Sequence, residues 1–264
     1  MVDAIFAEPR LAAVYDALDG DRDDLDVYTA LVDELGARSV LDIGCGTGTF
    51  ACLLARRGTD VIGLDPAEAS LNVARRKPGA DRVRWLAGDA SAPVATGPRA
   101  DGGTGIDLVT MIGNVAQVFL ADEDWAAALA TASAALRPGG WLAFEVRDPA
   151  RQAWRGWDRA HAYRRAHVPG VGDVEAWPEV TDVRLPLVSF RWTVVFAADG
   201  VSLTSESTLR FRSRDEVAAS LGAAGFALHE VRGAPDRPGA EFVFLAHRWV
   251  PPPGAAEEGT SDDA

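Results

Sequence analysis

Between residues 39 and 147 the sequence alternates short runs rich in β-branched residues with longer segments rich in alanine, leucine and arginine. This alternation is typical of βαβ units, in which helices connect parallel strands and pack on the faces of the sheet. It predicts five strands, at 39–43, 61–65, 83–87, 106–111 and 141–146. The segments between them predict helices at 49–57, 66–76 and 122–136.

Local signals support these boundaries. Gly58 follows two arginines, which is typical of a helix C-terminus, and Asp65 predicts an N-cap with Pro66 as the first helical residue. Asp122 is a second candidate N-cap. The sequence Arg-Pro-Gly-Gly at 137–140 predicts a turn into the fifth strand.

The pattern changes after Asp148. Alternating stretches at 174–184, 188–197 and 202–212, with an Asp-Gly turn at 199–200, predict an antiparallel sheet. A capping box at 213–216 then opens another helix, and two more strand candidates follow at 227–231 and 241–247. The antiparallel part therefore interrupts a βα repeat and does not end it.

Composition excludes several classes of function. The 264 residues carry 26 basic and 39 acidic side chains, a formal net charge of −13. Such a surface repels phosphate backbones and anionic lipids, so neither nucleic acid nor a membrane is an expected partner. No segment reaches the roughly 18 apolar residues of a spanning helix, and residues 1–9 lack the basic start of a signal peptide. Cys45 and Cys52 cannot build a disulfide framework or a cysteine zinc site, so we expect a cytoplasmic protein without a metal.

A glycine-rich motif, Asp-Ile-Gly-Cys-Gly-Thr-Gly at 42–48, lies where the first strand should meet the first helix. Glycine lets the backbone approach a ligand closely and adopt positive φ, and open α/β sheets bind ligands at this edge. The motif therefore predicts a nucleotide-like ligand. The dinucleotide fingerprint requires glycine at Thr49, which disfavours a nicotinamide oxidoreductase.

Three acids end the first three predicted strands. Asp42 precedes the glycines, Asp65 can accept from both hydroxyls of a ribose, and Asp89 can accept from the exocyclic amine of a base. Together they form an anionic crevice. Such a crevice suits a ligand with a free ribose and a positively charged end, and it repels pyrophosphate.

With these motifs the sequence resembles the class I S-adenosylmethionine-dependent methyltransferases. Segments 40–48, 63–65, 88–90, 107–109 and 136–140 follow the order and spacing of that family. The resemblance implies that Asp42 and the 44–48 loop hold the methionine end, Asp65 the ribose, and Asp89 with the backbone of Ala90 the adenine. The cofactor residues predicted in this way are Asp42, Gly44, Cys45, Gly46, Gly48, Asp65, Pro66, Asp89, Ala90 and Tyr28.

The resemblance also completes the expected architecture. It implies an α/β fold with a Rossmann-like, mostly parallel seven-stranded sheet, helices on both faces, and an antiparallel β insertion after strand five. We expect residues 1–38 to form a helical N-terminal cover and 39–149 with 213–250 to form the cofactor-binding core. Residues 150–212 are expected to cover the substrate, and 251–264 to be a disordered tail.

The acceptor side is less specific. A hydroxyl or ammonium acceptor needs a general base, for which His161, His167, Asp148 and Glu145 are candidates. Asn114 follows strand four, where the family places substrate or methyl-proximal groups, and is a candidate for both catalysis and substrate binding. Arg147 can bind an acidic substrate group, although an ordinary salt bridge is the alternative. The tryptophans that can form a substrate wall or simply pack in the core are Trp154, Trp157, Trp177 and Trp192.

Tyr15 and Tyr28 are the aromatic candidates of the N-terminal segment, able to lie over the sulfonium or to pack in the core. The sequence as a whole predicts transfer of a methyl group from S-adenosylmethionine to a small-molecule nitrogen or oxygen acceptor by in-line displacement. Methylation of RNA or protein, and a non-catalytic S-adenosylmethionine-binding module, are the alternatives. The protein is expected to be a monomer or homodimer.

Overall fold

The computed structural model describes residues 2–20, 22, 24–91, 93–97, 103–234 and 237–249. The predicted disordered tail at 251–264 lies outside these residues. The central sheet has the strand order β10-β11-β5-β4-β1-β2-β3, and β11 runs antiparallel to both of its neighbours while the remaining pairs are parallel. Its strands are β1 (Ser39–Ile43), β2 (Asp60–Asp65), β3 (Val83–Ala87), β4 (Ile106–Met111), β5 (Leu136–Arg147), β10 (Phe226–Gly233) and β11 (Glu241–Arg248).

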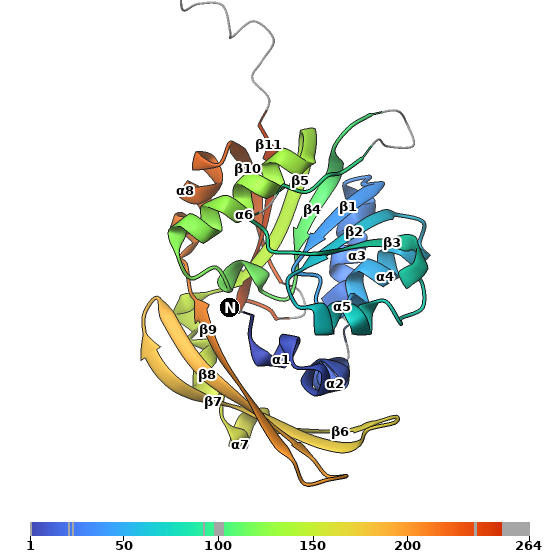
Figure 1. Ribbon diagram of the computed structural model, residues 1–264. Helices are drawn as coiled ribbons and strands as arrows, with labels where there is room; N and C mark the ends of the chain where they lie inside the picture. Colours follow the sequence, from blue (N-terminus) through green and yellow to red (C-terminus); the bar gives the residue numbers. More distant parts are fainter. Residues whose placement is uncertain are drawn as a thin grey trace, which may run out of the picture.

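Helices cover both faces of this sheet, as the sequence predicted (Figure 1). Because successive strand residues point to opposite faces, Leu41 of β1 packs with α6 and α8 whereas Val40 packs with α3 and α4. Every residue of β1 and β4 is buried, which explains their nearly continuous apolar sequences. The helices around the sheet are α3 (Asp24–Glu34), α4 (Thr49–Arg56), α5 (Glu68–Ala74), α6 (Asp122–Ala135) and α8 (Arg214–Ala223).

A second, antiparallel sheet has the order β6-β7-β8-β9. Its strands are β6 (Arg164–Val168), β7 (Gly172–Arg184), β8 (Leu187–Phe196) and β9 (Ser202–Arg210), with α7 (Arg159–Ala162) before them. The three long strands agree with the predicted ones. Strand β6 was missed because its sequence, Arg-Arg-Ala-His-Val, has four exposed or half-buried residues and only Val168 buried.

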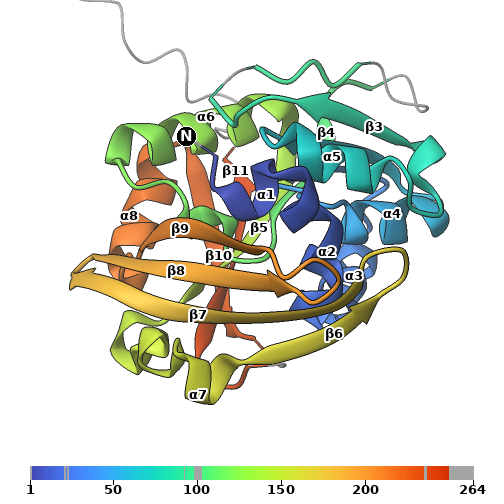
Figure 2. The ribbon, with the colours of Figure 1, turned by 60° about the horizontal axis from the view of Figure 1, so that its bottom comes forward.

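The N-terminal helices α1 (Ala4–Ala7) and α2 (Pro9–Asp19) lie between the two sheets (Figures 1 and 2). Leu11, Val14 and Leu18 of α2 pack in one apolar cluster with Val174 and Phe196 of the antiparallel sheet. On the other side, Ser70 Oγ of α5 donates to the carbonyl oxygen of Phe6 over 2.9 Å. The N-terminal segment is therefore fixed by the antiparallel sheet on one side and by α5 on the other.

Several predicted boundaries were wrong. Helix α5 begins at Glu68, so Pro66 is not its first residue and Asp65 is not its N-cap. Asp122 is the first residue of α6, and Ala121 is the N-cap. Residues 137–140 belong to β5, where an irregularity in the pairing with β4 accommodates them. The capping box at the start of α8 is confirmed.

Four short 3-10 helices complete the described part of the chain: η1 (Ala80–Arg82), η2 (Val115–Gln117), η3 (Pro149–Arg151) and η4 (Ala153–Gly156). Helix η2 directly follows the end of β4 and faces the glycine turn. None of the described helices combines the length and the apolar character needed to cross a membrane.

Candidate active site

The turn after β1 is built from glycines that no other residue replaces easily. Gly44, Gly46 and Gly48 have φ values of +72°, +52° and +74°, in the left-handed region. A Cβ atom on Gly44 would lie 2.6 Å from Val115, and one on Gly48 would lie 2.4 Å from Trp85. Backbone conformation and close packing therefore both require glycine at the first and third of these positions.

Asp65, at the end of β2, holds this turn in place. Its Oδ2 accepts from the backbone N–H of Gly46 over 2.8 Å, and its Oδ1 accepts from the N–H of Ala67 over 2.8 Å. Burial raises the pKa of Asp65, and the two N–H donors partly offset that rise. The carboxylate predicted to bind ribose thus already organises the loop of the neighbouring strand.

Asp42 lies beneath the turn, almost completely buried. Thr110 Oγ1 donates to its Oδ1 over 2.8 Å. Burial, with the nearby charge of Asp65 as a smaller contribution, raises the pKa of Asp42 to about 7. A cation next to this carboxylate would favour its ionised form, because opposite charges stabilise each other in a poorly solvated site.

The glycine turn, α2, α3 and the loop after β4 surround a cavity of about 190 Å³, here called the inner cavity. Its described lining contains five carboxylates and three guanidinium groups: Asp19, Asp24, Asp42, Glu145, Glu241, Arg22, Arg147 and Arg237. Tyr28 and Cys45 also line it. The excess of carboxylates makes the inner cavity suited to a ligand that carries positive charge.

Glu145, near the end of β5, is buried at the inner cavity and holds the loop after β4. Its Oε1 accepts from the backbone N–H groups of Gly113 and Asn114, over 2.6 and 2.9 Å. Its Oε2 accepts from the hydroxyl of Tyr28. Burial, with the charge of Glu241 as a further contribution, raises the pKa of Glu145 to about 7 although the N–H donors lower it.

Asn114 lies where the inner cavity meets a second one. It has a φ of +62°, which is uncommon for a residue other than glycine. Its Nδ2 donates to Glu241 over 3.2 Å, while its buried Oδ1 has no hydrogen-bond partner among the residues that the structure describes. A buried oxygen without a donor is rare in native proteins, so Asn114 offers an acceptor to a bound molecule.

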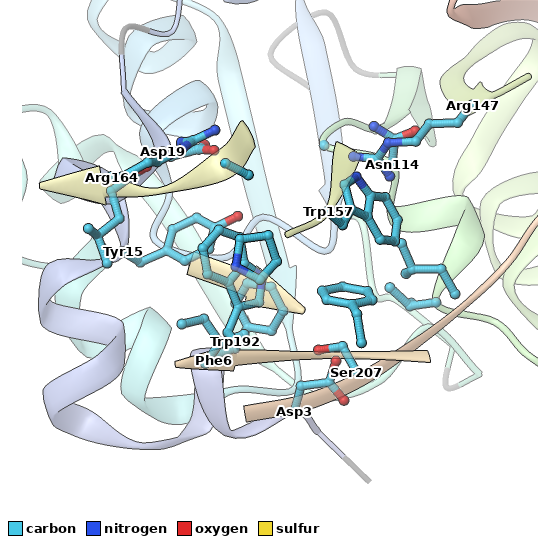
Figure 3. Close-up of a pocket in the computed structure, with 18 of the residues that line it drawn as sticks. Asp3, Phe6, Tyr15, Asp19, Asn114, Arg147, Trp157, Arg164, Trp192 and Ser207 are labelled. Carbon is cyan, nitrogen blue, oxygen red and sulfur yellow. Dashed lines mark hydrogen bonds between the residues drawn. The ribbon is translucent and has the colours of Figure 1, made fainter. Parts of the chain in front are cut away.

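The second cavity, of about 260 Å³ and here called the outer cavity, lies between α1–α2 and the antiparallel sheet (Figure 3). Its aromatic lining residues are Phe6, Tyr15, Trp157, Phe190 and Trp192. Tyr15, Asp19, Asn114 and Arg147 line both cavities. The two cavities therefore adjoin along the loop after β4.

Both candidate histidines lie away from these cavities. The His161 side chain is 70% exposed and pairs with Asp158 over 2.9 Å. His167 is 73% exposed and pairs with Asp173 over 2.7 Å. Neither lines the inner or the outer cavity. Asp148 instead caps η3, accepting from the N–H of Ala150 over 2.9 Å.

The tryptophans separate into two groups. Trp157 and Trp192 line the outer cavity. Trp154 is buried with its ring 4.7 Å from that of Phe211, and Trp177 stacks on Tyr163. Two of the four candidate tryptophans therefore line the outer cavity, and the other two do not.

The expected adenine residues lie apart from the inner cavity. Asp89 is close to the surface and accepts from both the N–H and the hydroxyl of Ser91. Ala90 packs in the core under α6, and Pro66 is exposed. Gly48 and Asp65 support the glycine turn without lining either cavity.

Sequence reasoning missed the contribution of α2 to the glycine turn. Thr47 Oγ1 donates to Asp16 Oδ1 over 2.5 Å, and Lys77 Nζ pairs with Asp16 Oδ2 over 2.6 Å. Phe6 and Arg22 of the N-terminal segment also line the inner cavity. The acidic and aromatic residues among the first 26 residues indicated that this segment could contribute to a site. Periodicity alone, however, did not show that it contacts the glycine turn, about 30 residues further along the chain.

Comparison with known proteins relates part of the chain to a protein family. Residues 40–140 match the family model described as "Methyltransferase domain". These residues, from here on called the methyltransferase domain, are the part of the chain that is similar to that family. The methyltransferase domain includes β1 to β4, the glycine turn, Asp42 and Asn114, and it stops within β5.

Curated relatives agree over part of the chain. The ubiquinone biosynthesis O-methyltransferase of Leptothrix cholodnii is 35% identical over 114 residues, which cover 42% of this chain and 45% of that protein. The protein of the same name from Acinetobacter baylyi is 58% identical over 41 residues, covering 16% and 17%. The matched stretches thus span less than half the length of either relative.

Solved structures extend the likeness to most of the chain. The CcbJ methyltransferase from Streptomyces caelestis has a TM-score of 0.73 at 21% identity, covering 91% of this chain and 96% of its own, and it shows the fold. The amino pentose methyltransferase CalS10 from Micromonospora echinaspora, a structure with bound SAM, has a TM-score of 0.66 at 26% identity and covers 89% and 97%. Over about nine tenths of its length, the chain therefore has a fold similar to that of these two methyltransferases.

Proposed function

We propose that this protein transfers a methyl group from S-adenosylmethionine to a nitrogen or oxygen atom of a small molecule. The observation that supports this best is the pair of adjoining cavities, an anionic one at the glycine turn and an aromatic one beside it. A cationic methyl donor suits the first, and a small apolar acceptor suits the second.

The residues present fit the cofactor. Three observations support it: the carboxylate excess of the inner cavity, the glycine turn, and the unpartnered Oδ1 of Asn114. Asp42 and the turn would hold the methionine end in the inner cavity, whereas the ribose and adenine would extend beyond that cavity, towards Asp65 and towards Asp89 with Ala90. When bound, S-adenosylmethionine supplies a sulfonium methyl group that is already activated towards nucleophiles.

The protein's own part is then mainly positioning. Tyr15, Asn114 and Arg147 line both cavities and can align the acceptor, and α1–α2 exclude water from above. Positioning of this kind contributes about 7–11 kcal/mol to lowering a barrier. No elaborate set of catalytic groups is required.

Asp19 is our candidate for accepting the acceptor's proton. Among the described residues it is the one carboxylate that lines both cavities. The oxygens of Glu145 already accept three hydrogen bonds, so that carboxylate is better suited to hold the loop after β4. Arg22 lies 3.1 Å from Asp19 and orients it.

The size of the outer cavity supports a small acceptor over RNA or a protein. About 260 Å³ is somewhat less than most drug-sized sites occupy, and residues of the N-terminal helices line one side of the cavity. The acidic composition also disfavours RNA. A cytoplasmic location, with the protein as monomer or homodimer, completes the proposal.

Two measurements test it. Calorimetry should detect S-adenosylmethionine and S-adenosylhomocysteine but not NAD, and Asp65→Ala should weaken that binding at least about tenfold because the ribose acceptor and the support of the turn are lost together. Asp60→Ala, at the exposed start of the same strand, is the matched control. Unchanged affinity in Asp65→Ala would show that the cofactor lies elsewhere.

Turnover requires a separate assay. Incubation with methyl-labelled S-adenosylmethionine and fractionated metabolite extract should give a labelled small-molecule product. Binding without any labelled product in any fraction would favour the non-catalytic module.

A further inference from the structure

Asp3 stands at the N-cap of α1 but does not cap it. An aspartate at this position usually accepts from a backbone N–H of the first helical turn. Here the side chain makes no such bond, and the helix uses the backbone carbonyl of Asp3, which accepts from Phe6 and Ala7 over 3.0 and 3.1 Å. The carboxylate is left to line the outer cavity next to Ser207.

The place of this carboxylate is fixed by its neighbours. The N–H of Ile5 donates to Ser205 Oγ of β9 over 2.9 Å, and Ser70 Oγ of α5 donates to the carbonyl of Phe6 over 2.9 Å. Both bonds hold α1 between the two sheets. These two bonds therefore fix the position of α1, and with it the position of Asp3 at the outer cavity.

The charge of Asp3 is not compensated by a described side chain. Burial raises its pKa, whereas the hydrogen bond from Ser207 and the positive charge of the chain's amino terminus lower it, and no arginine or lysine side chain is among these influences. The other charges at the outer cavity have partners. Arg147 and Arg237 share the carboxylate of Glu241, at 3.6 and 2.7 Å, and Asp19 pairs with Arg22.

Arg164 is the remaining cation of the cavity lining. It is exposed and donates to the carbonyl oxygen of Leu18. In Figure 3 it lies beside Asp19, on the far side of the cavity from Asp3. It therefore does not neutralise Asp3.

Aromatic rings line the space above Asp3. Phe6, Phe190 and Trp192 border the same cavity, and Figure 3 shows Trp192 and Phe6 close to Asp3 and Ser207. Aromatic faces attract cations, and a partly desolvated carboxylate does so more strongly. The combination is complementary to an ammonium group on an apolar molecule.

We propose that Asp3 and Ser207 bind an ammonium group of the acceptor at the end of the outer cavity remote from Asn114. The inference rests on the proposed function, because it takes the outer cavity as the acceptor site. Figure 3 places Asn114 and Arg147 at the opposite end, next to the inner cavity. The acceptor is then a small amine with an apolar ring, and the ammonium group bound by Asp3 is distinct from the atom that receives the methyl group.

Three probes test this, each with a phenyl ring on a two-carbon chain that ends in a different polar group: 2-phenylethylamine, 2-phenylethanol and 3-phenylpropanoate. Each is titrated into the full-length protein saturated with S-adenosylhomocysteine, and binding is followed by tryptophan fluorescence and by calorimetry. We expect the amine to bind at least about tenfold more tightly than the carboxylate, with the alcohol between them. Asp3→Asn should weaken the amine about tenfold and change the alcohol less than about twofold.

Asp182→Asn, an acid on β7 that pairs with Arg184 outside both cavities, is the matched control and should leave all three affinities unchanged. The thermal unfolding midpoint of Asp3→Asn should equal that of the unmodified protein, since α1 does not use the carboxylate. Tighter binding of the carboxylate probe, equal amine binding by Asp3→Asn, or binding of none of the probes would overturn the proposal. Failure of S-adenosylhomocysteine itself to bind would instead count against the proposed function.

Discussion

The carboxylate of Glu145 accepts three hydrogen bonds, from two backbone N–H groups and one tyrosine hydroxyl. It ties together β5, the loop after β4 and α3, through Gly113, Asn114 and Tyr28. The sequence suggested Glu145 as a base, but its three bonds suit a positioning role. That role depends on contacts with residues 31, 32 and 117 positions away in the sequence, which no local pattern reveals.

Replacing Glu145 with Gln tests the positioning role. The amide can satisfy some of the three donors but presents its own N–H₂ to another, which disturbs Asn114. We expect kcat to fall about tenfold to a hundredfold while the cofactor Kd changes less than about threefold. Tyr28→Phe, which removes one donor only, should have the smaller effect. A pH–rate profile that loses a limb in Glu145→Gln would identify a base instead.

Asp42 makes stability depend on pH. Its pKa is raised from 3.8 to about 7 by burial, so between these values the folded protein binds a proton that the unfolded chain has released. The contribution of Asp42 to the free energy of unfolding of the ligand-free protein should therefore be greatest below about pH 4. It should fall by up to about 4 kcal/mol as the pH rises to about 7. Urea unfolding at pH 5 and pH 8 should show a smaller difference in Asp42→Asn than in the unmodified protein. An equal difference would mean that Asp42 is ionised throughout.

At the scale of elements, the strands and the glycine turn were predictable because both follow from local rules. The spacing of β-branched residues gave β1, β3 and β4 with their observed bounds. Positive φ at Gly44 and Gly48 was likewise expected from the motif. The reason that these glycines are needed, Val115 against one and Trp85 against the other, depends on η2 and β3 and was not predictable.

Gly44→Ala should therefore affect both folding and cofactor binding. The new Cβ meets Val115 at 2.6 Å and the backbone keeps an unfavourable φ, so we expect destabilisation by about 2–4 kcal/mol and at least about tenfold weaker cofactor binding. In Gly46→Ala nothing lies within 4 Å of the new Cβ, so only the strained φ remains and the loss of stability should be about 1 kcal/mol. Equal losses in the two variants, measured by urea unfolding, would show that the clash with Val115 is relieved.

At the scale of the whole molecule, the site needs three parts of the chain that the sequence described separately. The methyltransferase domain supplies the turn, the N-terminal helices supply Tyr15 and Asp19, and the antiparallel sheet supplies Trp192 and Ser207. The sequence predicted each part and its order. It did not predict which side chains meet, and so it favoured His161 and His167 over Asp19.

Asp16 is the main polar link between the N-terminal helices and the core. Removing its bonds to Thr47 and Lys77 should loosen α2 on the glycine turn. In Asp16→Ala we expect hydrogen exchange in residues 9–19 to rise about tenfold and the cofactor to dissociate faster by a similar factor. Asp33→Ala, which removes an exposed pair with Arg57, should change neither. Unaltered exchange in Asp16→Ala would show that apolar packing alone holds the cover.

Under the proposed function, α2 lines the cavities of both the spent donor and the methylated product, so we expect the release of both to require movement of this helix. We expect their departures to be linked kinetically, with steady-state turnover governed by diffusion of this segment and not by bond exchange. Turnover would then slow in proportion to solvent viscosity, and a single-turnover burst would precede the slower steady rate.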